Sequence, residues 1–82
     1  MMIEVLGTGC AKCNKLYDIA AKAIAEAGVE ADLTKVEKLD EIASHGVFMT
    51  PGLVIDDQVK ISSRLPSVAQ VTTWLKEAEL AG

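Results

Sequence analysis

The stretch Gly7-Thr8-Gly9-Cys10-Ala11-Lys12-Cys13 gives the strongest indication of fold and chemistry in this chain. It follows Met2–Leu6, an apolar segment that is typical of a short strand ending in a tight turn. After it, apolar residues recur at three- and four-residue spacing from Leu16 to Ala27, which predicts an amphipathic helix. The two cysteines are therefore expected where the first strand gives way to the first helix.

This position favours reactive thiols. The first turn of a helix has unpaired N–H groups and the positive end of the helix dipole, and both stabilise an anion. A cysteine at such a position can have a pKa between about 3.5 and 7.5, below the value of about 8.5 for a free thiol. Lys12 adds a positive charge nearby and is a candidate neighbour of the reactive group.

The spacing of the two cysteines predicts how they share the chemistry. Residues three apart on a helix lie on the same side, so Cys13 is expected close enough to Cys10 to form a disulfide. Cys10 is the more exposed by position and is the predicted nucleophile, which forms a mixed disulfide with the substrate. Cys13 is the predicted resolving thiol, which attacks Cys10 and releases the reduced substrate. No bound cofactor is expected, because the cysteines themselves cycle.

A metal site is the alternative interpretation of the cysteine pair. Two thiolates can hold Cu(I), arsenite or a similar soft species, and small metal-transfer domains also place a C-x-x-C after the first strand. Those domains end their element order with a strand and carry a Met before the pair, and neither feature is found here. A closed zinc site needs four ligands, whereas this chain offers two cysteines and the distant His45. No resident metal is therefore expected.

The rest of the chain predicts the order β-α-β-(α)-β-β-α, an α/β fold. The helix between the first two strands is long enough for parallel pairing with a right-handed crossover. Gly28 is expected to end the first helix, and a strand over residues 29–36 and a short helix over 39–45 follow. A hairpin over 53–61 is expected to turn at Asp56-Asp57, and the last helix begins at Ser67, with Gln70 completing a capping-box pattern.

Composition limits the functional class. Eight Lys and Arg against twelve Asp and Glu give a formal net charge of −4, whereas a nucleic-acid-binding domain normally shows a basic face. No apolar run approaches the 18 or so residues of a membrane span, and the N-terminal segment lacks the basic region of a signal peptide. The length of 82 residues allows one domain, residues 1–82. We therefore expect a monomeric cytoplasmic protein.

The cysteine motif, this element order and Thr50-Pro51 before the hairpin together resemble the thioredoxin-like superfamily, in particular its small, glutaredoxin-sized thioredoxins. The resemblance implies a three-layer fold with a four-stranded mixed sheet. It also implies that Pro51 is cis and lies beside the active-site disulfide, and that Thr50 offers backbone hydrogen bonds to an extended substrate. The implied partners are disulfide-containing proteins and, as electron donor, a flavin-dependent thioredoxin reductase. Better-known thioredoxins have Trp and Gly-Pro where this chain has Gly9 and Ala11-Lys12.

Glu4 and Tyr17 are further candidate neighbours of the site. Glu4 lies six residues before Cys10, where many thioredoxins have a buried Asp, and a carboxyl near Cys13 could serve as its general base. A solvated strand residue is the alternative that the sequence favours for Glu4. Tyr17 either flanks the site or lies on the helix surface. His45 has no evident partner, so a contact with the C-terminal dipole of the short helix is expected.

Overall fold

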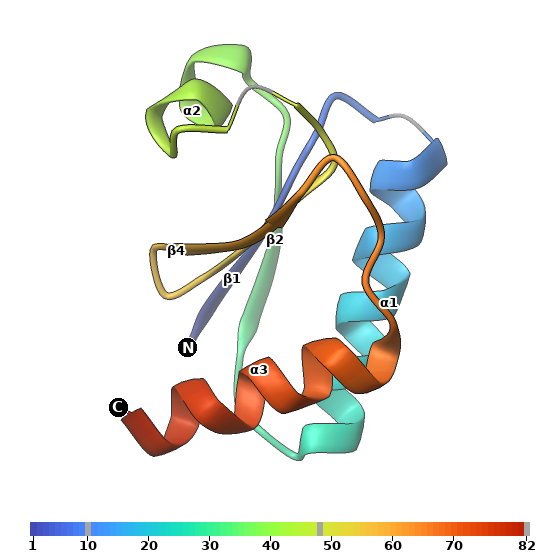
Figure 1. Cartoon of the computed structure of the whole chain (residues 1–82), viewed down its shortest axis with the longest axis vertical. Coiled ribbons are helices and arrows are strands. Elements are labelled where there is room, and N and C mark those ends of the chain that lie inside the picture. Colours follow the sequence, from blue (N-terminus) through green and yellow to red (C-terminus); the bar gives the residue numbers. More distant parts are fainter. Residues whose placement is uncertain (10, 48, 82) are drawn as a thin grey trace.

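The computed structural model describes residues 1–9, 11–47 and 49–81. The elements follow the predicted order along the chain (Figure 1). They are β1 (Met2–Leu6), α1 (Ala11–Ala27), β2 (Asp32–Val36), α2 (Leu39–Ser44), β3 (Gly52–Ile55), β4 (Gln58–Ser62) and α3 (Val68–Ala81).

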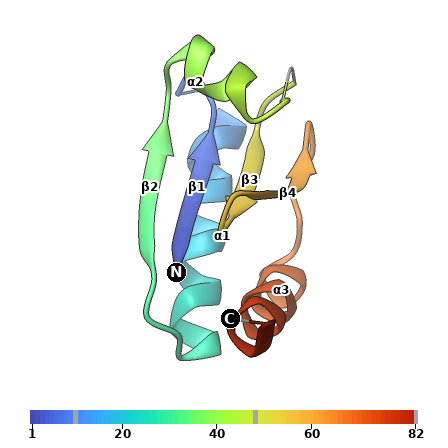
Figure 2. The ribbon, with the colours of Figure 1, turned by 90° about the vertical axis from the view of Figure 1, so that its left-hand side faces the viewer.

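The strands form one mixed sheet in the order β2-β1-β3-β4. β1 pairs in parallel with β2 and antiparallel with β3, and β3 pairs antiparallel with β4. Helices α1 and α3 cover one face of this sheet, and α2 lies on the other (Figures 1 and 2). The predicted α/β class, the four-stranded mixed sheet and the three layers are thereby confirmed, and the fold is thioredoxin-like.

Two apolar cores follow from the alternation of side chains along the central strands. Ile3 and Val5 of β1 pack with α1 and α3 in the larger core, whereas Leu6 packs with Ile42 of α2 in the smaller one. Every residue of β3 is buried, as expected for a strand covered on both faces. Its Val54 joins the smaller core, while its neighbours along the strand join the larger.

The ends of the elements explain where the predicted boundaries were displaced. Gly28 has φ +67° and ends α1, and residues 29–31 then lead to the edge of the sheet. Strand pairing begins only where Asp32 is opposite Met2, so β2 is shorter than predicted. Gln70 donates its backbone N–H to Ser67 Oγ over 3.1 Å, which caps α3 as the sequence predicts.

The hairpin turn is Asp56-Asp57, with φ values of 47° and 67°. Positive φ at both central residues is typical of the type I′ turn that suits the twist of a two-residue hairpin. Asp56 also ties the hairpin to the start of β1: its carboxylate accepts a hydrogen bond from the Met2 N–H (2.8 Å), and its own N–H donates to the Met2 carbonyl (2.9 Å). Of the described helices, none is long and apolar enough to cross a membrane.

Candidate active site

Cys13 lies in the first turn of α1 and is almost completely buried, with 5% of its surface exposed. The turn before the helix contains Gly9, whose φ of +85° places it in the left-handed region that favours glycine. Cys10 directly precedes the first residue of α1 in the sequence but lies outside the described residues. Its role as nucleophile therefore stays a prediction.

Gly7, the residue directly after β1, lies against the side chain of Cys13. Its N–H donates to the carbonyl of Val36 over 3.0 Å, which continues the pairing of β1 with β2. A Cβ built on Gly7 would overlap Cys13 Sγ and would lie 3.0 Å from Cys13 Cβ. The same point is 3.8 Å from Thr50 Cβ. Cys13 and Thr50 thus approach each other over Gly7, although 37 positions separate them in the sequence.

The segment that contains Thr50 has the geometry expected for it. The Thr50–Pro51 peptide bond is cis. Pro51 is buried and its carbonyl accepts a hydrogen bond from the Ser63 N–H (2.8 Å), whereas Thr50 is exposed. The structure therefore brings Thr50 to the side of Cys13, and Pro51 follows it directly in the chain. Their role in substrate binding stays a prediction.

A small pocket lies beside Cys13 between α1 and the end of β2. Gly7, Asn14, Lys35 and Glu37 line it together with Cys13. Its cavity volume of about 10 Å³ is close to the space that a single water molecule needs. The pocket is therefore too small for a substrate, and it offers a place for water next to the buried cysteine.

Lys35 connects this pocket to Tyr17. Its Nζ lies 4.9 Å from the centroid of the Tyr17 ring and donates to Asn14 Oδ1 over 3.4 Å. Tyr17 is half-buried and contacts Lys35, which lines the pocket beside Cys13. Tyr17 is thus linked to the site by Lys35. Lys12 is exposed in the first turn of α1.

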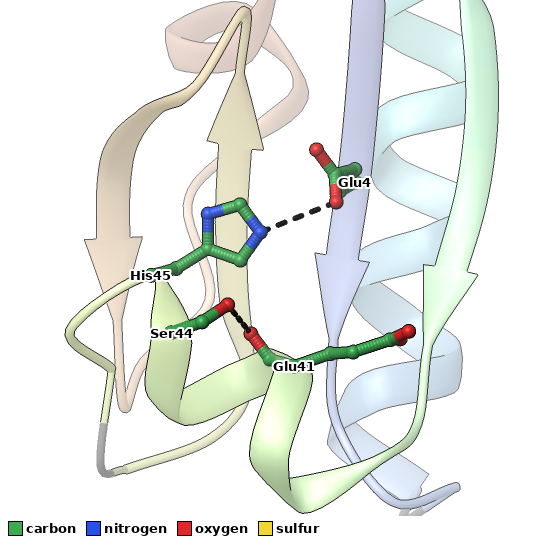
Figure 3. A network of polar contacts seen from close by, with 4 residues as sticks. All are labelled: Glu4, Glu41, Ser44 and His45. Atoms are coloured by element: carbon green, nitrogen blue, oxygen red, sulfur yellow. Dashed lines mark hydrogen bonds and ion pairs between the residues drawn. The ribbon is translucent and has the colours of Figure 1, made fainter.

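Glu4 lies on the other face of the sheet. Figure 3 shows its carboxylate pointing to His45, with Glu4 Oε2 3.3 Å from His45 Nε2. Their side chains are 17% and 19% exposed, respectively, so Glu4 is not the solvated residue that the sequence favours. Since adjacent side chains of a strand point to opposite faces, Glu4 shares the α2 face with Leu6. The structure does not bring Glu4 together with Cys13.

The structure gives His45 a side-chain partner that the sequence does not reveal. His45 does end α2, and its backbone N–H bonds back to Ile42 over 3.2 Å, but its side chain has a partner on β1. The sequence does not reveal this contact because His45 and Glu4 are 41 positions apart. Next to it, Ser44 Oγ donates to the Glu41 carbonyl over 2.6 Å, which satisfies one acceptor near the end of α2 (Figure 3).

Sequence reasoning did not identify Lys35 as a residue of this site. It included Gly7 in the motif but did not predict its contact with Cys13. A signal existed for each. Gly7 shares the strand alternation of Val5, so an apolar side chain would be expected there if space allowed. Lys35 stands opposite Val5 in the parallel pairing of β1 and β2, which places it at the same end of the sheet as the cysteine motif.

Comparison with known proteins gives consistent matches over nearly the whole chain. The model of a thioredoxin domain family matches residues 1–76. A thioredoxin of Methanocaldococcus jannaschii is 41% identical over 76 residues, which cover 93% of this chain and 87% of the relative. A thioredoxin of Methanothermobacter thermautotrophicus is 37% identical over 71 residues, which cover 87% of this chain and 92% of the relative. None of these matches supports the soft-metal alternative.

Proposed function

Because the chain belongs to the thioredoxin domain family, we propose that it reduces disulfides through a dithiol–disulfide cycle of Cys10 and Cys13. The family and the two relatives support thiol–disulfide oxidoreductase function of the general thioredoxin type. The division of roles between the cysteines, the substrates and the electron donor are the finer parts of the proposal.

One observation carries the division of roles: the burial of Cys13 against Gly7. A thiol with 5% of its surface exposed is poorly accessible to the sulfur of a large substrate. It is well placed to attack a neighbouring sulfur in its own motif. Cys13 is therefore assigned the resolving step, and the first attack is assigned to Cys10, which precedes α1.

The proposed cycle conserves atoms and electrons. The Cys10 thiolate attacks one sulfur of a substrate disulfide, and the other substrate sulfur leaves as a thiolate that takes up a proton. The Cys13 thiolate then attacks Cys10, so a Cys10–Cys13 disulfide forms and the second substrate thiolate leaves. The substrate gains two electrons and the protein loses two. A reductase, by analogy a flavin-dependent thioredoxin reductase, must return them.

Disulfide-containing proteins are the proposed substrates. Thr50 is exposed next to Cys13, and Pro51, the next residue in the chain, is buried. This arrangement supports a role for the Thr50 backbone in aligning an extended substrate segment beside the reacting sulfurs. Location in the cytoplasm and a monomeric state remain predictions.

Reduction of insulin disulfides by the Cys10→Ser and Cys13→Ser variants tests the cycle. Cys10→Ser should abolish turnover, because no thiol remains that can make the first attack. Cys13→Ser should instead accumulate a mixed disulfide with the substrate, detectable by mass spectrometry. If Cys10→Ser traps the substrate and Cys13→Ser does not, the roles are reversed. If both variants turn over at the wild-type rate, the proposed function is wrong.

A further inference from the structure

We propose that Gly7 is a positioning residue for the resolving cysteine: the absence of a side chain at this position creates the space that holds Cys13 Sγ. The inference rests on the proposed function for its chemical consequence, but its steric part stands on geometry alone. Gly7 would thus act through Cys13, without touching the substrate.

Backbone conformation does not account for a glycine at this position. Among the described glycines, those with positive φ are Gly9, Gly28 and Gly46, and a Cβ added at any of them would meet no atom of another described residue within 4 Å. Gly7 differs from these glycines in both respects. Its φ lies outside the left-handed region, but its surroundings leave no space for a Cβ. A Cβ there would overlap Cys13 Sγ and lie 3.0 Å from Cys13 Cβ, closer than ordinary van der Waals contact.

The backbones of Gly7 and Cys13 cannot move apart without breaking other contacts. Gly7 is held by its hydrogen bond to Val36 and is buried between its neighbours. Cys13 is held by α1, whose Leu16 and Ala20 are completely buried against the sheet. A helical side chain has few allowed rotamers, so an added methyl group would move Sγ to a different position. Gly7 therefore fixes where this sulfur lies.

The position of Cys13 Sγ matters for one step of the cycle in particular. A disulfide requires an S–S distance of about 2.05 Å and a dihedral angle near 90° about that bond, so closure depends on where both sulfurs lie. The first attack by Cys10 does not use Cys13 Sγ. A side chain at position 7 should therefore slow resolution and make the Cys10–Cys13 disulfide easier to reduce, while leaving the first attack nearly unchanged.

A small aromatic disulfide, 5,5′-dithiobis(2-nitrobenzoate), separates the two steps. Its first coloured thiolate reports attack by Cys10, and its second reports resolution by Cys13. For Gly7→Ala we expect release of the first within about twofold of the wild type and release of the second slowed at least about tenfold, with a less negative reduction potential. Resolution at the wild-type rate would overturn the proposal.

Gly28→Ala is the matched control. It adds the same methyl group at the opposite end of α1, where it strains the backbone at φ +67° but meets none of the described residues within 4 Å. We expect it to lower the urea midpoint of unfolding without changing the ratio of the two release rates. If Gly28→Ala slows resolution as much as Gly7→Ala does, general loss of stability explains the effect and the proposal is wrong.

A double-mutant cycle tests the steric part without any exchange reaction. Removing the sulfur with Cys13→Ala should shrink the loss of urea midpoint caused by Gly7→Ala, because the main overlap disappears. The comparison remains informative if Gly7→Ala alone does not fold. In that case the Gly7→Ala, Cys13→Ala double variant should fold, because it lacks the overlapping sulfur. An equal loss in both backgrounds would overturn the inference. If the wild type releases no thiolate from the aromatic disulfide, the proposed function is wrong. The double-mutant cycle still shows in that case whether Gly7 makes space for the sulfur.

Discussion

The two faces of the sheet use β1 in different ways. On the face covered by α1 and α3, Val5 packs into the larger core, and Gly7, two residues further on, lies against Cys13 without a side chain between them. On the α2 face, Glu4 pairs with His45 beside a small apolar core. Proximity to the cysteines in the sequence therefore does not determine which residue contacts them in the fold. The alternation of the strand decides it, and Glu4 is on the wrong face.

The largest effect that should distinguish the two faces is on stability. Leu16→Ala removes a completely buried side chain from α1, one turn after Cys13 and inside the larger core. We expect the free energy of unfolding to fall by about 3 kcal/mol, from lost burial and the cavity left behind. Urea unfolding followed by circular dichroism measures it. Such a loss is large for a small domain, whose total stability is marginal. A loss under about 1 kcal/mol would show that this face is packed less tightly than described.

The corresponding change on the other face is Ile42→Ala in α2. Ile42 is 3% exposed but belongs to the smaller core, whose other described members are one leucine and three valines. The same measurement should give a loss of about 2 kcal/mol, toward the low end for such substitutions, because a short helix can partly relax into the space. A larger loss than for Leu16→Ala would reverse the ranking of the two cores.

The next effect concerns the pair between Glu4 and His45. A double-mutant cycle of Glu4→Gln and His45→Gln should give a coupling of about 0.5–1 kcal/mol, because the two groups are mostly shielded from solvent. Release of both thiolates from the aromatic disulfide should stay within about twofold of wild type in Glu4→Gln, since the carboxylate faces away from Cys13. A tenfold slower resolution in this variant would mean that the carboxylate serves Cys13 as a base, and the contrast between the faces would fail.

The smallest effect is expected at the pocket beside Cys13. Lys35→Met keeps much of the aliphatic side chain but removes a positive charge from the lining of this pocket. Resolution should slow by about threefold, because a nearby cation favours the attacking thiolate. Lys22→Met, which removes an exposed lysine further along α1, is the control. Equal rates in both variants and the wild type would show that Lys35 only packs against Tyr17.

Local patterns were enough to predict most of the fold. The spacing of apolar residues gives α1, Gly28 gives its end, and Asp56-Asp57 gives the hairpin, because each depends on contacts between near neighbours in the sequence. The bounds of β2 were less accurate, since they depend on where pairing with Met2 begins.

The site was predictable to a lesser degree for the same physical reason. The cysteine motif and Thr50-Pro51 are visible in the sequence, but what surrounds them depends on strand register and on which elements cross. The contact of Gly7 with Cys13 joins two elements, and that of Glu4 with His45 crosses from β1 to α2. The alternation of β1 indicates the face on which Gly7 and Glu4 lie, but no local pattern identifies the residue that each contacts on another element.

The bonds between Asp56 and Met2 also have a practical consequence. They fix the start of β1 at one pole of the molecule, and α3 finishes at Ala81 near the same pole (Figure 2). The cysteine motif follows the opposite end of β1. A fluorophore or a resin linkage at Met1 would therefore project away from the exchange site, so the protein could be immobilised as bait for mixed-disulfide partners with its redox motif facing solution.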